Sequence, residues 1–194
     1  MISFLISAIK IIFLLGFLIG IHETGHFLIA KLCKVRVNEF AIGFGPVIWK
    51  KQGKETKYEL RLIPLGGFVN MEGEAEQSEK EGSFTKASIP RRIAIVVAGA
   101  LVNIIFAIIV YFILAMTVRG NLTNAVVGNR VLDADNFENR LYFASYNTKE
   151  FMLSIAESVK QLFTGKVSSA ELVGPVGISE VVAKTNGFRE FIYI

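Results

Sequence analysis

Two long blocks of apolar residues dominate the pattern of the chain. The first, residues 1–21, carries Lys10 as its only charged side chain, and the second, residues 93–118, carries none. Each block is long enough to cross a bilayer as a helix, which takes about 20 residues. The pattern predicts a mainly α, polytopic membrane protein, with a first transmembrane helix over residues 1–33 and a second that fills the second block.

The segment between the two spans, residues 34–92, has a different period. Apolar and charged side chains alternate over residues 57–62, which is typical of a strand, and residues 52–54 (QGK) favour a turn between two strands. We expect three or four short strands over residues 35–71, forming a small membrane-associated β-sheet. A mobile acidic loop is predicted over residues 72–89, because this stretch holds almost no apolar side chains.

Beyond the second span the chain becomes more polar. Residues 119–148 are predicted to form a short extracytoplasmic linker. The stretch that follows has the apolar stripe of an amphipathic helix, with Asn147 and Glu150 as a capping pair and Gly165 at its C-terminal end. The last segment, residues 149–194, would hold this helix on the outer surface of the membrane, then a Gly-Pro-Val-Gly turn and the start of a further apolar helix.

Basic residues are concentrated between the two spans. The chain has 21 lysines and arginines against 17 acidic residues, and 12 of the 21 lie between the two apolar blocks, from Lys31 to Arg92. The positive-inside rule then places the segment in the cytoplasm. The basic residues are not interleaved with aromatic ones, so no nucleic-acid partner is expected. The single cysteine, Cys33, excludes an internal disulfide and is best interpreted as a small core residue.

The first span contains a candidate metal site in the sequence GIHETGHFLIAK. His22 and His26, the two histidines of the chain, are four residues apart, which places both imidazoles on one helix face where they can share a metal ion. Glu23 lies beside them, in the position of a general base that takes a proton from metal-bound water. Imidazole suits Zn²⁺, which lowers the pKa of that water and polarises a scissile carbonyl. The pattern predicts a zinc hydrolase with two histidine ligands and Glu23 as base.

A second interpretation is that the two histidines are buried and merely hydrogen-bonded. Polar groups in a membrane span each cost about 2–3 kcal/mol or more unless they are satisfied, which favours a functional site. Asn103 interrupts the second apolar block in the same way. It either packs against another helix or faces a polar cavity.

The ordered set of motifs resembles the site-2 protease family of intramembrane zinc metalloproteases, of the bacterial type related to the sigma-E-activating protease. The motifs are, in order, HExxH at 22–26, EFAIGFGP at 39–46, RLIPLGGFVNMEGE at 61–74, Gly99-Ala100-x-x-Asn103 where the family has Gly-Pro-x-x-Asn, and LVGPVGI at 172–178. The resemblance implies a β-hairpin region that receives an unwound substrate as an added strand. Candidates for substrate binding or structural support are Asn103, Gly43, Gly45, Gly66 and Gly67.

The resemblance also implies a substrate and a location. The family cleaves transmembrane segments of single-span proteins, such as anti-sigma factors or signal-peptide remnants. Such an enzyme would be a multi-pass protein of the bacterial inner membrane, in contact with the lipid bilayer and with its active site toward the cytoplasmic side.

Two features of the family are not found in the sequence. The family completes its zinc site with an aspartate from an Asn-x-x-Pro-x-Pro-x-x-Asp-Gly segment, and it carries a PDZ domain, for which residues 119–148 are too few. We therefore expect a shortened or incomplete member. We nominate no third ligand, because the expected topology places Asp133 and Asp135 across the membrane from the cytoplasmic segment.

Two other functions stay open. A non-catalytic membrane adaptor that binds transmembrane partners would be consistent with the missing aspartate. A metal transporter that uses the histidine pair is disfavoured, because a conduction path needs more polar groups in the spans than Asn103 and the His-Glu-His cluster provide.

Overall fold

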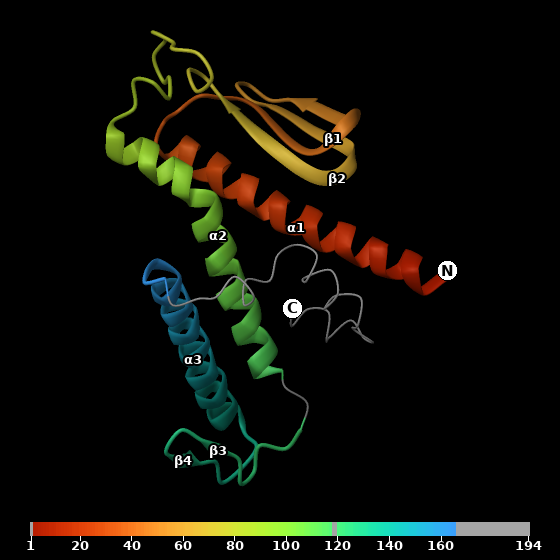
Figure 1. Ribbon diagram of the computed structural model, residues 1–194, viewed down its shortest axis with the longest axis vertical. Helices are drawn as coiled ribbons and strands as arrows, with labels where there is room; N and C mark the ends of the chain where they lie inside the picture. The colour runs from red at the N-terminus through yellow and green to blue at the C-terminus, as the bar shows by residue number, and fades with distance from the viewer. Residues whose placement is uncertain (1, 118–119, 166–194) are drawn as a thin grey trace. The chain divides into compact units, whose positions relative to one another are not determined.

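The computed structural model describes residues 2–117 and 120–165, and it divides the chain into two compact units, residues 1–104 and 105–194. Helix α1 (Ile2–Leu32), strands β1 (Val37–Gln52) and β2 (Lys57–Met71), and helix α2 (Ile89–Met116) follow in order. Strands β3 (Val126–Val127) and β4 (Arg130–Val131) and helix α3 (Phe137–Phe163) belong to the second unit. The protein is mainly helical, as predicted (Figure 1).

Helices α1 and α2 are long and apolar enough to cross a membrane, over Leu5–Leu32 and Ile89–Met116. Helix α1 matches the residues for which one long helix is predicted. Helix α2 begins four residues earlier than predicted, because Pro90 is tolerated in a first helical turn, where its missing N–H costs no hydrogen bond. The basic pair that precedes the apolar block is therefore helical. The division of the whole chain into five segments stays a prediction.

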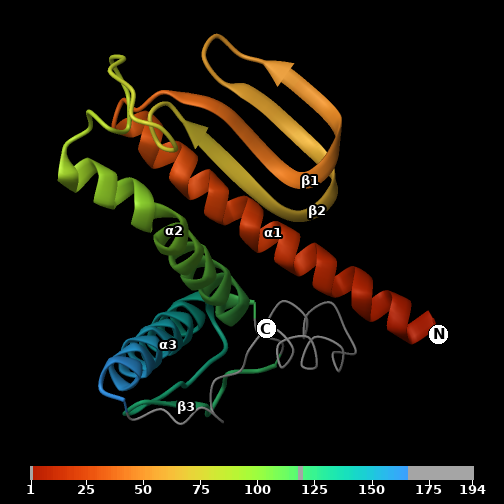
Figure 2. The same cartoon turned by 45° about the horizontal axis from the view of Figure 1, so that its top comes forward.

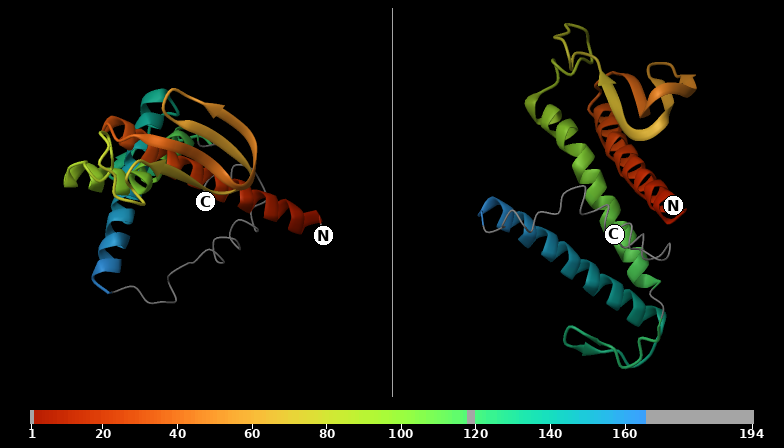
Figure 3. Two further views of the ribbon diagram at one scale, coloured as in Figure 1. Left: turned by 90° about the horizontal axis from the view of Figure 1, so that it is seen from above. Right: turned by 45° about the vertical axis from the view of Figure 1, so that its right-hand side comes forward.

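The sheet of the first unit contains two long strands, so the expectation of three or four short ones is corrected. Both strands bend sharply, and the first half of β1 lies between two parts of β2: Glu39 pairs with Lys57 on one side and with Asn70 on the other. The second half of β1 pairs with residues 57–61 only. The paired segments therefore lie in the order 47–52, 57–61, 39–42 and 67–71. Figure 2 shows the resulting curved sheet along one side of α1, and Figure 3 shows it from two other directions.

The bends depend on glycines with positive φ. Gly43 (φ 90°) and Gly45 (φ 81°) interrupt β1, and Gly66 (φ 111°) interrupts β2. L-residues rarely adopt this backbone region, and glycine adopts it freely. At Gly66 a Cβ atom would also lie 2.0 Å from the ring of Phe44. An alternating pattern predicts strands but not where they double back, which is why the strand number was wrong.

The acidic segment between β2 and α2 has no regular structure, but it is tied to the sheet. The Phe84 N–H donates to the Glu72 carbonyl oxygen at 2.7 Å, and the Arg36 N–H donates to that of Gly82 at 2.8 Å. Ser83 is buried. Hydrogen bonds from Ser78, Lys80 and Asn38 lower the pKa of the Glu72 carboxyl to about 2. The loop is therefore attached to the sheet by hydrogen bonds, in spite of its polar composition.

The second unit has a small core beneath a hairpin. Leu122, Val127 and Leu132 are buried against the side chains of Tyr142 and Tyr146. The predicted capping pair of Asn147 and Glu150 is wrong. Helix α3 starts ten residues before Asn147, at Phe137, because the Asn136 side chain accepts a hydrogen bond from the Asn139 N–H at 2.8 Å.

The C-terminal end of α3 agrees with the sequence. The helix ends at Phe163, Thr164 is its C-cap, and Gly165 follows with φ 66°, the conformation that glycine favours after a helix. The predicted Gly-Pro-Val-Gly turn and the start of a further apolar helix lie outside the described residues.

The low pKa of Glu72 predicts how the acidic segment responds to pH. A folded-state pKa of about 2, below the usual 4.5, means that the ionised carboxylate stabilises the folded loop above pH 4.5. This contribution is lost as the pH falls from about 4.5 to about 2. Protection of the Phe84 amide from hydrogen exchange, corrected for the intrinsic rate, is expected to decrease over that window.

The matched variants separate this effect from general acid unfolding. Glu72→Gln is expected to show reduced protection already at pH 6 and no further change between pH 4.5 and 2, whereas the exposed Glu81→Gln behaves as the wild type. A wild-type profile in the Glu72→Gln variant would contradict the assignment.

Candidate functional site

The two histidines lie on one face of α1 and converge on one point. Their Nε2 atoms are 3.1 Å apart, and the ring planes are close to perpendicular, at 76°. Two nitrogens that each bind a tetrahedral zinc ion at about 2.0 Å lie about 3.3 Å from one another. The pair therefore fits two coordination positions of Zn²⁺ with a small adjustment of the rings.

Helix α2 sets the tautomer of His26. The Nδ1 atom of His26 lies 2.7 Å from the carbonyl oxygen of Ile95, a residue that is fully buried. A carbonyl oxygen only accepts, so Nδ1 carries the proton and donates. Nε2 keeps its lone pair for a metal, as in zinc sites where a second group orients the ligating histidine.

Two glycines allow α1 and α2 to approach this closely. A Cβ atom at Gly25 would lie 2.8 Å from the carbonyl oxygen of Ala98. A Cβ atom at Gly99 would lie 2.5 Å from Nε2 of His26 and 2.6 Å from Nε2 of His22. The backbone of α2 at Gly99 therefore forms the wall of the histidine site, and even a methyl group there would push against the ligating atoms.

Gly99 is a site residue that the sequence analysis did not nominate. It stands four residues before Asn103, in the segment Gly99-Ala100-x-x-Asn103 that was used only for the family resemblance. A spacing of four places both residues on one face of α2. That spacing was the available signal for Gly99, although the partner across the interface required the structure.

Glu23 faces the sheet, away from α2. Its Cγ atom lies 2.9 Å from the position that a Cβ would take at Gly67 of β2, so the missing side chain of Gly67 makes room for it. Among the described residues the Glu23 carboxylate forms no hydrogen bond and no ion pair. Its oxygens are therefore available to accept a proton.

The other predicted residues have different positions. Gly43, Gly45 and Gly66 shape the bends of the sheet, and of the four predicted sheet glycines Gly67 is the one packed against Glu23. The Oδ1 atom of Asn103 is buried and has no hydrogen-bond partner among the described residues. Substrate binding by these residues stays a prediction.

Two other glycines of α1, Gly16 and Gly20, pack against the sheet. A Cβ at Gly16 would lie 2.1 Å from the carbonyl oxygen of Pro64 in β2, and one at Gly20 would lie within 4 Å of the Ile42 side chain in β1. Phe27 completes this contact with Phe40, at 5.1 Å between ring centroids. Among the described residues, therefore, Gly25 contacts a second helix, whereas Gly16 and Gly20 contact the sheet.

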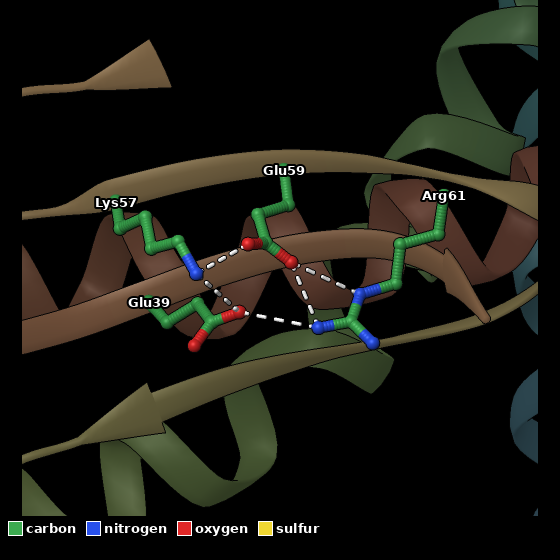
Figure 4. A network of polar contacts seen from close by, with 4 residues as sticks. All are labelled: Glu39, Lys57, Glu59 and Arg61. Carbon is green, nitrogen blue, oxygen red and sulfur yellow. Dashed lines mark hydrogen bonds and ion pairs between the residues drawn. The ribbon is translucent and has the colours of Figure 1, made fainter. Parts of the chain in front are cut away.

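A charged network on the opposite face of the sheet connects its segments (Figure 4). The buried Glu59 carboxylate accepts from Arg61 at 2.8 Å and pairs with Lys57, and Arg61 also reaches Glu39 of β1 at 3.4 Å. The hydrogen bond from Lys57 is the main reason that the pKa of Glu59 is lowered. The network joins β1 at Glu39 to the first part of β2, and the same part of β1 pairs on its other side with the segment that contains Gly67.

No third metal ligand is evident in the part of the chain that the structure describes, where no group of three His, Cys, Asp or Glu side chains could hold an ion. Asp133 and Asp135 have other partners: Asp133 accepts from Asn139 at 2.9 Å, and Asp135 pairs with Arg140 at 2.7 Å. The hydrogen bond from Asn139 lowers the pKa of Asp133. The described residues therefore offer two candidate ligands, His22 and His26, and one candidate base, Glu23.

A helix that bears His-Glu-x-x-His, with converging imidazoles and an adjacent carboxylate, defines a zinc-peptidase type of site. Comparison with known proteins agrees. The sequence model described as "Peptidase family M50" matches residues 10–194. The chain belongs to this family, the site-2 proteases, which are zinc metalloproteases.

Individual relatives support the same family. Protease RseP of Yersinia pestis is 32% identical over 98% of this chain and 44% of its own length. The regulator of sigma-E protease RseP of Escherichia coli is 42% identical over 58% of the chain and 26% of its own length. A zinc metalloprotease of Clostridium acetobutylicum is 46% identical over 53% and 30%. The chain thus spans less than half the length of these curated relatives.

The wall formed by Gly99 predicts the effect of adding one methyl group. Gly99→Ala is expected to turn both imidazoles away from each other and to weaken zinc binding by about 10–100-fold, the range seen when groups that support a zinc ligand are disturbed. Competition with a chromogenic chelator measures the affinity. Ala100→Leu, at the exposed neighbouring position, is the control and should bind zinc as the wild type does. Unchanged zinc affinity in Gly99→Ala would show that the ion does not sit between the two Nε2 atoms.

Proposed function

We propose that the chain forms the His-Glu-x-x-His part of an intramembrane zinc endopeptidase that cleaves transmembrane segments of single-span proteins. The observation that carries the proposal is the pair of Nε2 atoms 3.1 Å apart, with Nδ1 of His26 held by Ile95, on a helix apolar enough to span a membrane. A structural role needs neither the convergence nor the free Glu23 carboxylate.

Each residue has a distinct task in this function. His22 and His26 hold the ion, and Ile95 keeps the His26 lone pair directed at it. Zinc at such a site lowers the pKa of a water molecule and polarises the scissile carbonyl. Glu23 accepts the proton of the attacking water and passes it to the leaving amine. Helix α2 at Gly99 closes one side of the site, so the substrate enters from the side of the sheet.

The position of β2 suggests how a substrate is held. Residues 67–71 pair with β1 on one side, and among the described residues no strand pairs with their other side. Such an edge offers N–H and C=O groups to an extended peptide. Gly67 begins this edge and lies against Glu23, so a peptide added there would pass the base. An extended form also exposes the peptide bonds that a substrate helix shields.

The setting of the site is a bacterial inner membrane. Helices α1 and α2 would cross the bilayer, and the basic residues between them would place their shared end in the cytoplasm. Two relatives are named as regulators of sigma-E. We propose anti-sigma factors and signal-peptide remnants as two classes of single-span substrate.

Exchange of one oxygen for nitrogen at Glu23 tests the proposal. Glu23→Gln keeps the shape of the side chain but removes the base, so cleavage of a single-span reporter in membranes is expected to fall by about 10²–10⁴-fold with zinc content unchanged. His22→Ala is expected to lose both zinc and cleavage, whereas Glu76→Gln, an exposed acidic side chain, should retain both.

The outcomes distinguish the alternatives. Full cleavage by Glu23→Gln would refute the assigned base. If the wild type binds the reporter and zinc without cleaving it, the non-catalytic adaptor is the better description. Equal zinc in the wild type and His22→Ala would refute the metal site itself.

A further inference from the structure

We propose that a basic pocket at the shared end of α1 and α2 binds the phosphate headgroup of an anionic phospholipid. This pocket has a volume of about 870 Å³ and is separate from the histidine site. One side of the pocket is formed by the end of α1 and the residues that follow it. The other side is formed by the acidic segment that leads into α2. Its volume is within the range of about 300–1,000 Å³ that is usual for ligand pockets.

The charge of the pocket is strongly positive. Its basic lining residues are Lys31, Lys34, Arg36, Lys86 and Arg91, against the two acidic residues Glu55 and Glu81, which leaves an excess of three positive charges. Such an excess concentrated in one cavity predicts an anionic ligand.

Two of the five cations have an acidic partner among the described residues, and three do not form an ion pair there. Lys31 pairs with Glu55 at 2.9 Å, and Lys86 pairs with Glu79 at 3.1 Å. Within the described part of the chain, Lys34, Arg36 and Arg91 form no ion pair. Lys34 and Arg36 come from the segment after α1 and Arg91 from the first turn of α2, and all three line the same pocket. Arginine in particular binds phosphate oxygens through two parallel hydrogen bonds.

The backbone that carries these cations is held firmly. Lys34 adopts φ 61° at the end of α1, where the Val35 N–H returns to the carbonyl oxygen of Ala30 at 2.9 Å. Arg36 is fixed by its N–H bond to Gly82. Val35 and Ala30 are buried in the core that also includes Ile95. The backbone positions of Lys34 and Arg36 are therefore fixed by the fold, although their side chains are exposed.

Its place along the helices favours a lipid over a soluble anion. Because α1 ends at Leu32 and α2 begins at Ile89, the pocket lies where both candidate spans would leave the hydrocarbon and meet the headgroups. Leu32 is 77% exposed and Ile89 is 64% exposed, so apolar surface for acyl chains is present at the same end. Basic pockets between helices at the cytoplasmic side suit anionic headgroups. The inference depends on the membrane placement proposed above but not on proteolysis.

Native mass spectrometry of the full chain in a non-ionic detergent tests the pocket. Phosphatidylglycerol and phosphatidylcholine are offered together, and the wild type is expected to retain phosphatidylglycerol. The pocket variant K34Q/R36Q/R91Q is expected to bind it about 100-fold more weakly, since each basic residue at an anionic surface contributes roughly fivefold. The matched control K50Q/K51Q/K54Q removes the same charge from the exposed hairpin and should bind as the wild type does.

A charge-preserving variant and two competitors complete the design. K34R/R36K/R91K is expected to stay within threefold of the wild type, and circular dichroism checks that all variants fold. Equal losses in the pocket and control variants, or no preference for phosphatidylglycerol, would overturn the proposal. Displacement by inorganic phosphate at the lipid's own concentration would identify a soluble-anion site instead. Displacement by a stoichiometric acidic peptide would assign the pocket to a protein segment.

Discussion

The site depends on the close approach of the backbones of α1 and α2 at Gly25 and Gly99. Only at this separation does the Ile95 carbonyl oxygen reach the imidazole of His26, at 2.7 Å. A polar N–H in hydrocarbon must find a partner inside the protein, and here that partner also decides which nitrogen is left for a metal. Side chains at either glycine would separate the helices, and the histidines would lose both their orientation and the wall behind them.

Helix α1 presents two faces to two different partners. The face that carries His22, Gly25 and His26 meets α2, while the adjoining face, with Glu23 and Phe27, meets the sheet. Residues one apart in a helix are rotated by about 100°, because a turn takes 3.6 residues. The ligands and the base therefore face different neighbours, yet the reacting atoms stay within one turn. The bends of the sheet bring Gly67 against α1, on the face that carries Glu23.

Local patterns predicted the two long apolar helices and the shared helix face of the two histidines. The spacing of His22 and His26 fixes their common face in any helix, and the length of the apolar blocks needs no tertiary information. The features that were missed depend on contacts across the chain. Gly99 is a site residue only because α2 meets α1 there, and the doubled sheet follows from the positive φ of Gly43 and Gly66. Asn136 caps α3 although Asn147 has the stronger sequence pattern, and the helix that follows this cap packs Tyr142 and Tyr146 against the core around Leu132.

The polar groups of the two apolar helices differ in whether they have a hydrogen-bond partner. Thr24 donates to the Gly20 carbonyl oxygen at 2.7 Å, and the His26 ring is held by Ile95 and faces His22. Within the described residues, the buried Asn103 Oδ1 atom has no such partner, and the Glu23 carboxylate, whose oxygens are not among the buried unpartnered atoms, forms no hydrogen bond or ion pair. Both are acceptors, and an unmet acceptor in an apolar setting costs free energy that a bound group must offset. Water and the N–H groups of an extended peptide are the donors that a peptidase brings to its site. A free carboxylate at Glu23 and an unmet acceptor at Asn103 are therefore the groups at which the proposed water and substrate contacts would lower that cost.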